Sequence, residues 1–333
     1  MRTYILKRLL MVPLTLFGVV CVTFFVIKLA PGDPAAMIVG TGISGEIKQG
    51  QLNKEAIEQW RKDRGLDKHI AVQFGKWCWD VARLDFGRSF IPPRRPCLDE
   101  IIERLPITIA MNLISFGLIY LIAIPAGIYS CVAQYSMGDR ILTVILFVFY
   151  SLPSFWVATM CLLFFCGGDF LAWFPTQGYT KVDYHQVGLW KWLTTWAHHL
   201  FLPVMCQTYP GFAMLSRQMR VGMLENIRLD YVRTARAKGL PESKVILKHV
   251  LRNSLIPVIT IFGLLLPAML AGSVIIEQIF GIPGMGKLFF EAILSRNYPL
   301  VMAETVLAAG LTLIGVLISD LLYAVVNPTI TLK

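Results

Sequence analysis

The segment Gly281-Ile-Pro-Gly-Met-Gly-Lys287 has the spacing GxxxxGK, which is typical of loops that hold the phosphates of a nucleotide. In such a loop a Ser or Thr hydroxyl follows the lysine and binds Mg²⁺. Here the next residue is Leu288, and a long apolar stretch precedes the motif where a strand would be expected. We therefore interpret these glycines and Pro283 as a tight re-entrant or interfacial turn, and the chain as lacking an ATPase site of its own.

The remaining chemistry-bearing residues do not have the spacing of a catalytic or metal site. None of the seven cysteines forms a CxxC pair or a Cys/His ligand set, and five of them fall in or beside apolar runs. Cys78 and Cys97 share a polar segment, so a disulfide between them stays an open alternative. Glu304 and Asp320 are separated by 16 residues, which is about 24 Å along one helix and too far for paired catalysis. We interpret both as interfacial charges that reach towards water.

The composition indicates a membrane protein. Of the 333 residues 56% are hydrophobic and only 16% are charged, whereas about a quarter of the residues in a soluble domain are charged. The net charge of +10 comes from Lys and Arg that cluster beside the apolar runs. That placement fits membrane topology and excludes a stripe of cations that follows a nucleic acid.

Six apolar segments are long enough to cross a bilayer. The second, third and fifth contain no Asp, Glu, Lys or Arg between their ends, so they offer no proton relay and no intramembrane catalytic pair. The energy for transport is therefore expected to come from another subunit. The predicted spans are residues 9–28, 107–133, 141–166, 199–216, 255–276 and 301–325.

Loop charge predicts the orientation of these spans. The N-terminus is basic, and residues 217–254 carry nine Lys and Arg against three acidic residues. Under the positive-inside rule both segments are cytoplasmic, which with six spans also puts the C-terminus inside. The outside then receives residues 30–106, 167–198 and 277–300.

Residues 30–106 are expected to be folded, because they contain aromatic residues that a solvating linker lacks. We predict a short helix over 53–62, capped by Asn53 and followed by Gly65. Two alternatives stay open, a small cap that packs on the spans and amphipathic pieces that lie in the membrane interface. The aromatic residues are Trp60, Phe74, Trp77, Trp79, Phe86 and Phe90.

The cytoplasmic segment 228–257 predicts a helix, a sharp corner and a second helix. Asp230 is suited to cap the first helix, Gly239 to end it, and Pro241 to begin the second. The small residues of Thr234-Ala235-x-Ala237 are expected to let another protein approach the first helix closely.

This segment resembles the EAA loop of ABC importer permeases, in which a short helix docks into a groove of the ATP-binding subunit. Arg233-Thr-Ala235 stands where the general motif has Glu-Ala-Ala, and Gly239 matches its glycine. The run 230–239, followed by 249–253 and Pro257, is similar to the dipeptide, oligopeptide and nickel branch of that family. Further stretches that resemble this branch are residues 4–9, 29–34, 64–67, 85–90, 104–106, 276–286, 297–299, 320–323 and 327–328.

The resemblance implies an all-α membrane protein with six transmembrane helices of the type I ABC importer permease kind and a folded extracytoplasmic segment between helices 1 and 2. The implied parts are residues 1–29 (cytoplasmic N-terminus and first helix), 30–106 (extracytoplasmic), 107–326 (five-helix core with the coupling loop 217–254) and 327–333 (cytoplasmic tail). The implied coupling residues are Asp230, Tyr231, Arg233, Thr234, Ala235, Ala237, Gly239 and Pro241. The implied turn after the fifth helix includes Glu277, Phe280, Pro283, Gly284 and Gly286.

The resemblance also implies a non-catalytic permease subunit of the bacterial inner membrane that imports di- or oligopeptides. Its implied partners are a second homologous permease, two ATP-binding subunits that hold ATP and Mg²⁺, a solute-binding protein and membrane lipid. No cofactor, metal or nucleic acid is expected on this chain, and no substrate-contacting residue follows from the motifs. The alternatives are an ATP-independent carrier or channel, a membrane enzyme or scaffold, and, within ABC importers, nickel or glutathione-like cargo.

Overall fold

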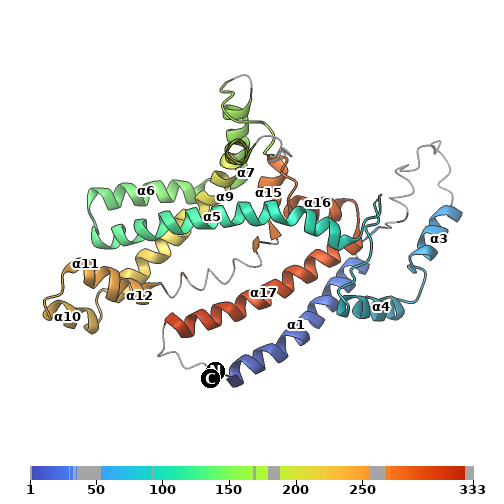
Figure 1. Cartoon of the computed structure of the whole chain (residues 1–333), viewed down its shortest axis with the longest axis horizontal. Helices are drawn as coiled ribbons and strands as arrows, with labels where there is room; N and C mark the ends of the chain where they lie inside the picture. Colours follow the sequence, from blue (N-terminus) through green and yellow to red (C-terminus); the bar gives the residue numbers. More distant parts are fainter. Residues whose placement is uncertain are drawn as a thin grey trace.

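The computed structural model describes residues 2–29, 31–32, 35, 54–91, 93–167, 170–178, 188–255, 258, 268–269 and 271–326. Within these residues the chain is helical, apart from one isolated bridge between Arg88 and Pro96. The molecule is elongated, with the long helices running roughly along one direction (Figure 1). The all-α fold with apolar helices that the family resemblance implies is thus confirmed at that level.

Three helices are long and apolar enough to cross a membrane, judged by length and composition over the described residues. They are α1 (Arg2–Leu29), α5 (Cys97–Val132) and α17 (Tyr298–Val326). α1 contains the predicted span 9–28, and α17 contains the predicted span 301–325. α5 covers the predicted span 107–133 except for its last residue, and it begins ten residues earlier. The helices α1 and α17 pack against each other and run in opposite directions (Figure 1).

The third predicted span, residues 141–166, is not one straight helix. It is divided into α6 (Met137–Ser151), α7 (Ser154–Cys161) and a π-helical turn (Leu162–Cys166), with a bend of 91° between the two halves. The bend lies at Leu152 and Pro153. Proline disfavours helical geometry in the residue before it, and Leu152 is extended with φ −81° and ψ 124°. A bent pair of this kind is either one broken span or a re-entrant loop.

The fourth predicted span lies inside a much longer helix, α9 (Leu189–Asn226, 38 residues), which is about 57 Å long at 1.5 Å per residue. It therefore includes residues 217–226, which the sequence assigned to a loop. The helix packs along α5, and one of its faces is buried from Leu200 to Met223. Its charged residues, Lys191, Arg217, Arg220 and Glu225, lie towards the two ends of the helix, which makes α9 less apolar over its whole length than the three long helices. Most of the fifth predicted span, 255–276, including Pro267, lies outside the described residues.

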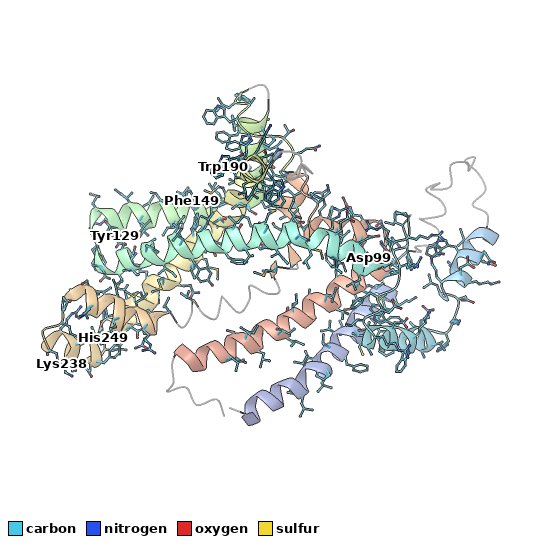
Figure 2. All side chains as sticks on the ribbon, viewed as in Figure 1. Asp99, Tyr129, Phe149, Trp190, Lys238 and His249 are labelled. Atoms are coloured by element: carbon cyan, nitrogen blue, oxygen red, sulfur yellow. The ribbon has the colours of Figure 1, made fainter. Side chains whose placement is uncertain are left out.

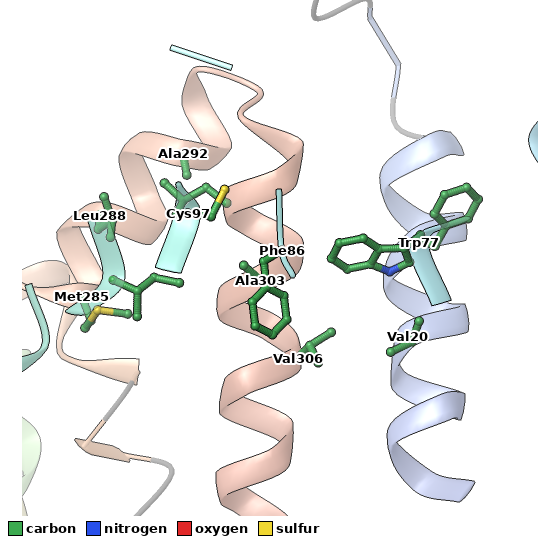
Figure 3. Close-up of a cluster of buried hydrophobic side chains, with 12 residues drawn as sticks. Val20, Trp77, Phe86, Cys97, Met285, Leu288, Ala292, Ala303 and Val306 are labelled. Atoms are coloured by element: carbon green, nitrogen blue, oxygen red, sulfur yellow. The ribbon is translucent and has the colours of Figure 1, made fainter. Parts of the chain in front are cut away.

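Residues 54–96 pack on the ends of the long helices. They form α3 (Lys54–Asp63) and α4 (Ile70–Ala82). The predicted helix over 53–62 is confirmed for its described part; Asn53 lies outside it, and Gly65 has the left-handed φ of +64° that ends a helix. Figure 3 shows Phe86 and Trp77 between α1 and α17. Cys78 and Cys97 are both free thiols, and Cys97 is buried in this same cluster.

The remaining helices are short and form two separate groups (Figure 1). One group, at one end of the molecule, consists of α10 (Asp230–Ala237), α11 (Glu242–Lys244), a π-helical turn (Val245–Val250) and α12 (Leu251–Ser254). The other consists of α15 (Val274–Ile279) and α16 (Met285–Leu294).

One interpretation of charge is wrong. Glu304 of α17 does not reach towards water: it is 7% exposed, and its Oε1 is buried with no hydrogen-bond partner. It faces the interior because α16 and Ala271 cover this part of α17, where they enclose a cavity of about 200 Å³. Sequence position near a helix end therefore did not decide whether the side chain is buried.

Candidate functional site

The segment 230–254 forms the predicted helix, corner and second helix. The first helix is α10, and α11, the π-helical turn and α12 follow one another without interruption to form the second. Gly239 lies between them with φ +75°, a conformation that L residues with a side chain rarely adopt. Its N–H donates to Arg236 O at 2.9 Å and Leu240 N–H donates to Ala235 O at 3.4 Å. Gly239 thus ends the helix as the sequence predicted.

Two details at the helix starts differ from the prediction. The N-cap of α10 is Leu229, and Asp230 is the first helical residue, whose side chain makes no capping hydrogen bond. Its carboxylate lies 3.6 Å from Arg233 and has the sign that suits the positive end of the helix. Pro241 is the N-cap of α11, one residue earlier than expected. Ser, Thr, Asp and Asn are only preferences at a cap, and helix boundaries commonly shift by one residue.

The inner face of α10 is fixed to α9. Val232 and Ala235 are buried in a cluster with side chains of α9 and of the second helix of the loop. Ala235 therefore packs against this chain's own core, and it is not available for the close approach of another protein that its small size suggested. The rest of the buried cluster consists of Ala123, Cys131, Leu215, Met219, Met223, Val245, Ile246, Val250 and Val258.

The outer face of α10 is exposed. Asp230, Arg233, Thr234 and Ala237 are all exposed, and Tyr231 is half-buried, with its hydroxyl donating to Asn226 Oδ1 at 3.0 Å. These residues form a short polar ridge at one end of the molecule. Figure 2 shows Lys238 and His249 at this end, far from Asp99 at the start of α5.

An ion pair between Arg236 and Glu242 joins α10 to α11 across the corner at Gly239. Arg236 Nη2 lies 2.6 Å from Glu242 Oε1 and Nε lies 3.1 Å from Oε2, so the guanidinium holds both carboxylate oxygens. The hydrogen bond from Arg236 lowers the pKa of the Glu242 carboxyl, and the same bond raises the pKa of Arg236. Both side chains are exposed, so the pair stabilises the corner by less than about 1 kcal/mol. Its main effect is to fix the angle between the two helices.

A buried carboxylate fixes the neighbouring turn between α5 and α6. Asp139 accepts hydrogen bonds from Ser130 Oγ at 2.6 Å, Tyr135 N at 3.0 Å and Arg220 Nη2 of α9 at 2.9 Å. Burial by itself raises the pKa of Asp139, but these hydrogen bonds and the Arg220 charge bring that pKa below its ordinary value. The ion pair thus ties α6 to α9 near the loop.

The turn after the fifth predicted span is built around a second buried carboxylate. Glu277 of α15 accepts from Ser273 N at 3.2 Å and from Lys287 N at 2.8 Å. Thr108 of α5 donates to Glu277 Oε1 at 3.4 Å and accepts from Met285 N at 2.8 Å. Lys287 is in the first turn of α16, so the carboxylate meets N–H groups that have no partner within the helix. Glu277 therefore joins α15, α16 and α5.

Glycines make room for this carboxylate. A Cβ on Gly284 would lie 2.5 Å from the Glu277 carboxylate, and a Cβ on Gly272 would lie 2.3 Å from its Oε1. A Cβ on Gly286 would lie 2.6 Å from Val274 N. Two N–H groups of the GxxxxGK stretch are thus taken by the protein itself, that of Lys287 by Glu277 and that of Met285 by Thr108.

The other predicted residues of this turn are structural. Phe280 is buried among side chains of α9, α5 and α7, and its carbonyl accepts from Gly178 N at 2.7 Å. Pro283 follows the buried Ile282 and precedes the N-cap of α16, Gly284. The turn and the segment 230–254 therefore lie at different places in the molecule, and α9 contributes to the buried cluster at each.

Hydrogen bonds of the Asn297 side chain join two stretches that the family resemblance singled out, residues 85–90 and 297–299. Asn297 Oδ1 accepts from Phe90 N at 2.9 Å, and Asn297 Nδ2 donates to Ser89 Oγ at 2.7 Å. Both Asn297 and Ser89 are buried. Residues 85–90 and 297–299 thus pack together and hold the segment 54–96 against the start of α17.

Sequence reasoning missed the roles of three buried carboxyl groups. Ser136-x-x-Asp139 before an apolar run is the pattern of a capping box, and Ser136 Oγ indeed accepts from Asp139 N at 3.2 Å, so that residue was identifiable. Glu277 was named, but its partners come from far along the chain. The position of Glu304 near the start of its helix indicated an exposed interfacial charge, whereas the side chain is buried. In the described residues no group of three or more His, Cys, Asp or Glu side chains is arranged to hold a metal ion.

Comparison with known proteins gives one consistent family. The family described as "Binding-protein-dependent transport system inner membrane component" matches residues 123–332, and its N-terminal counterpart matches residues 1–112. The oligopeptide transport system permease protein AppB of Bacillus subtilis is 38% identical over 330 residues, covering 99% of each chain. A putative peptide transport system permease protein of Brucella abortus is 35% identical, with 99% of each chain covered. The peptidoglycan transport system permease protein YejB of Agrobacterium fabrum is 32% identical over 99% of this chain and 98% of its own.

Proposed function

The chain belongs to the family of inner membrane components of binding-protein-dependent transport systems, and we propose that it forms half of the peptide pathway of an ATP-driven importer. In this reading it is a multi-pass, non-catalytic subunit. The relatives named as oligopeptide and peptide permeases support peptides as the cargo, in preference to nickel or glutathione-like solutes.

The observation that carries the proposal is the form of α10. Its inner face is buried against α9, and its outer face carries exposed polar side chains at one end of the molecule. Because its inner face is packed against α9, α10 transmits a force applied to its exposed face to α9 instead of moving independently of it. This is what an ATP-driven partner requires of the surface on which it acts.

The proposed partners follow from this surface and from the family. Two ATP-binding subunits hold ATP and Mg²⁺ and dock on α10 and its equivalent in a second, homologous permease. A solute-binding protein delivers the peptide at the opposite end of the molecule. No ATP site is proposed on this chain, because in its GxxxxGK turn the Lys287 N–H donates to Glu277 and the Met285 N–H donates to Thr108.

We further propose six spans with both chain ends in the cytoplasm. The charge of residues 217–254 supports this orientation. It is also supported by the direction of the helices, because the start of α1 and the end of α17 point towards the end of the molecule that carries α10 (Figure 1). The proposed domains are those given above, with residues 30–106 outside the cell membrane and 217–254 as the coupling loop, of which 217–226 continue α9.

The proposal is tested by reconstituting the four-subunit transporter in vesicles and measuring ATP-dependent uptake of a labelled peptide. The variant Arg233→Glu reverses one charge on the exposed face of α10 without touching the core. We expect uptake to fall at least tenfold while the permease still inserts and assembles with its homologous partner. Lys62→Glu, an exposed charge reversal on α3, is the matched control and is expected to leave uptake unchanged.

Two results would contradict the proposal. Peptide transport by the purified chain without ATP or partners would establish an independent carrier or channel. Normal uptake after removal of residues 228–240 would show that transport does not depend on docking at α10, and an enzymatic or assembly activity that survives this removal would favour a membrane enzyme or scaffold.

A further inference from the structure

A basic cavity lies at the end of the molecule opposite α10. Its volume is about 540 Å³, and it is enclosed by the last turns of α1, by α4, by the segment 85–90 and by the start of α17. It contains none of the residues of the two sites described above. Six cationic side chains line it, namely Lys28, Arg64, Lys68, Lys76, Arg88 and Arg94, against three acidic ones, namely Asp63, Asp80 and Asp85.

The six cationic side chains around this cavity outnumber the three acidic ones. Among the described residues none of the six forms an ion pair within 4 Å. The Arg64 guanidinium lies 3.9 Å from the centre of the Trp60 ring and 5.7 Å from that of Phe90, and its Nη1 donates to Trp60 O at 3.2 Å. Burial and the neighbouring charge of Arg94 lower the pKa of Arg64. An anion beside these like charges would relieve their repulsion.

The inner wall of the cavity is apolar. Phe24 and Ile27 of α1, Trp77 of α4 and Met302 of α17 line it below the cations. Lys28, which donates a hydrogen bond to Gln73 of α4, is the penultimate residue of α1. The cavity thus lies where α1 ends, and for a helix that crosses a bilayer this is the depth of the headgroups.

The surfaces beside the cavity are suited to acyl chains. On the last turns of α1, Phe25, Val26 and Leu29 are exposed, and on α4 Val72 and Trp79 are exposed. Lysine and aromatic residues on an amphipathic helix are typical of helices that lie in the membrane interface. A ligand that fits cations above and apolar surface below carries both a negative headgroup and hydrocarbon.

We propose that this cavity binds one anionic phospholipid, with its phosphate among Arg64, Arg94 and the two lysines Lys68 and Lys76, and its acyl chains along the exposed side of α1. The lipid would fill the space between α1, α4 and α17 and hold the segment 54–96 against the membrane. The cavity has no role in the proposed docking of ATP-binding subunits, so the two proposals fail independently.

The test is native mass spectrometry of the detergent-purified transporter titrated with dioleoyl phosphatidylglycerol, with phosphatidylcholine as the neutral comparison. The variant Lys68→Gln with Lys76→Gln removes two exposed cations from the cavity. Each cation near an anionic lipid surface contributes about 1 kcal/mol, so binding is expected to weaken about thirtyfold. Lys54→Gln with Lys62→Gln, two exposed lysines of α3 outside the cavity, is the matched control and should bind as the wild type does.

Three outcomes would overturn the proposal. The first is equal binding of phosphatidylglycerol by the two double variants. The second is equal affinity of the wild type for soluble glycerol 3-phosphate, which would make the cavity a site for a free anion. The third is loss of binding-protein association in Lys68→Gln with Lys76→Gln while lipid binding is unchanged, which would assign these cations to that protein.

Discussion

Replacing Glu277 by Gln tests whether a buried carboxylate holds the turn between α15 and α16. Both of its oxygens accept: Oε1 from Ser273 N and Thr108 Oγ1, and Oε2 from Lys287 N. A glutamine side chain of the same shape has one acceptor oxygen and one NH₂ donor. In either orientation the NH₂ group faces a backbone N–H, so at least one buried donor loses its partner.

The structure sets the size of the effect. A buried donor left without a partner costs about 1–3 kcal/mol, and losing a negative charge at the start of α16 costs up to about 1 kcal/mol more. The side chain is 1% exposed, so water does not replace the lost bond, and the glycines around it leave no room for a large rearrangement. We therefore expect Glu277→Gln to destabilise this part of the protein by about 1–4 kcal/mol.

The assay is thermal unfolding of the purified transporter, followed together with peptide uptake in vesicles. Glu291→Gln is the matched control, because Glu291 is an exposed carboxylate on α16, 3.9 Å from Lys287. Glu277→Gln should lower the unfolding temperature and uptake, and Gly284→Ala should do the same, because its Cβ would press on the Glu277 carboxylate. The control should change neither.

Equal unfolding temperatures for Glu277→Gln and Glu291→Gln would contradict the claim that an ionised Glu277 carboxylate stabilises the turn between α15 and α16. That result would mean that the carboxyl group is protonated and donates a hydrogen bond, since only then does glutamine reproduce its pattern of donors and acceptors.

Three further changes probe the loop and the contacts that support it. Gly239→Val is expected to strain the corner by about 1–2 kcal/mol, because φ is +75° at this position; a clash is not the cause, since a Cβ there meets no neighbour. Peptide uptake should fall while ATP hydrolysis persists. Normal uptake would count against docking at α10. Asp139→Asn is expected to cost about 2–3 kcal/mol at neutral pH. Because the pKa of Asp139 lies below its ordinary value, the wild type should lose the same stabilisation only as the pH falls through that pKa, and an acid titration of unfolding that is identical in the two proteins would contradict this. Asn297→Ala leaves Phe90 N unpaired and is expected to cost about 1–3 kcal/mol, detected as faster proteolysis within residues 54–96 while the rest of the chain stays protected.

Local rules predicted the parts of this protein whose cause is local. Gly65 and Gly239 end helices in the left-handed conformation because nothing but glycine adopts it cheaply. The run Gly239-Leu240-Pro241 was sufficient to predict the corner between α10 and α11. The failed nucleotide motif was also identifiable, because Leu288 lacks the hydroxyl that a magnesium ligand requires.

Features that depend on distant partners escaped the sequence. Pro153 lies inside an apolar run of the right length for one span, and only the extended backbone at Leu152 shows that the run bends. Ala235 has the size expected of a docking residue, but the α9 side chains that bury it come earlier in the chain. Glu304 is near the start of its helix like many exposed charges, and it is buried because α16 folds back over it.

The long helix α9 gives a physical route between the two sites. Its N-terminal half packs with Phe280 of the Glu277 turn, and its C-terminal half, at Met219 and Met223, packs with Val232 of α10. Leu202 and Met223 are 21 residues apart, which is about 32 Å and close to the thickness of the hydrocarbon layer. Pro210 lies between these two contact regions, where its ring and missing N–H break one backbone hydrogen bond. Pro203, which lies within the first of these contact regions, removes a backbone hydrogen bond in the same way. We therefore expect a change in helix angle that follows a displacement at α10 to occur at one of these two prolines.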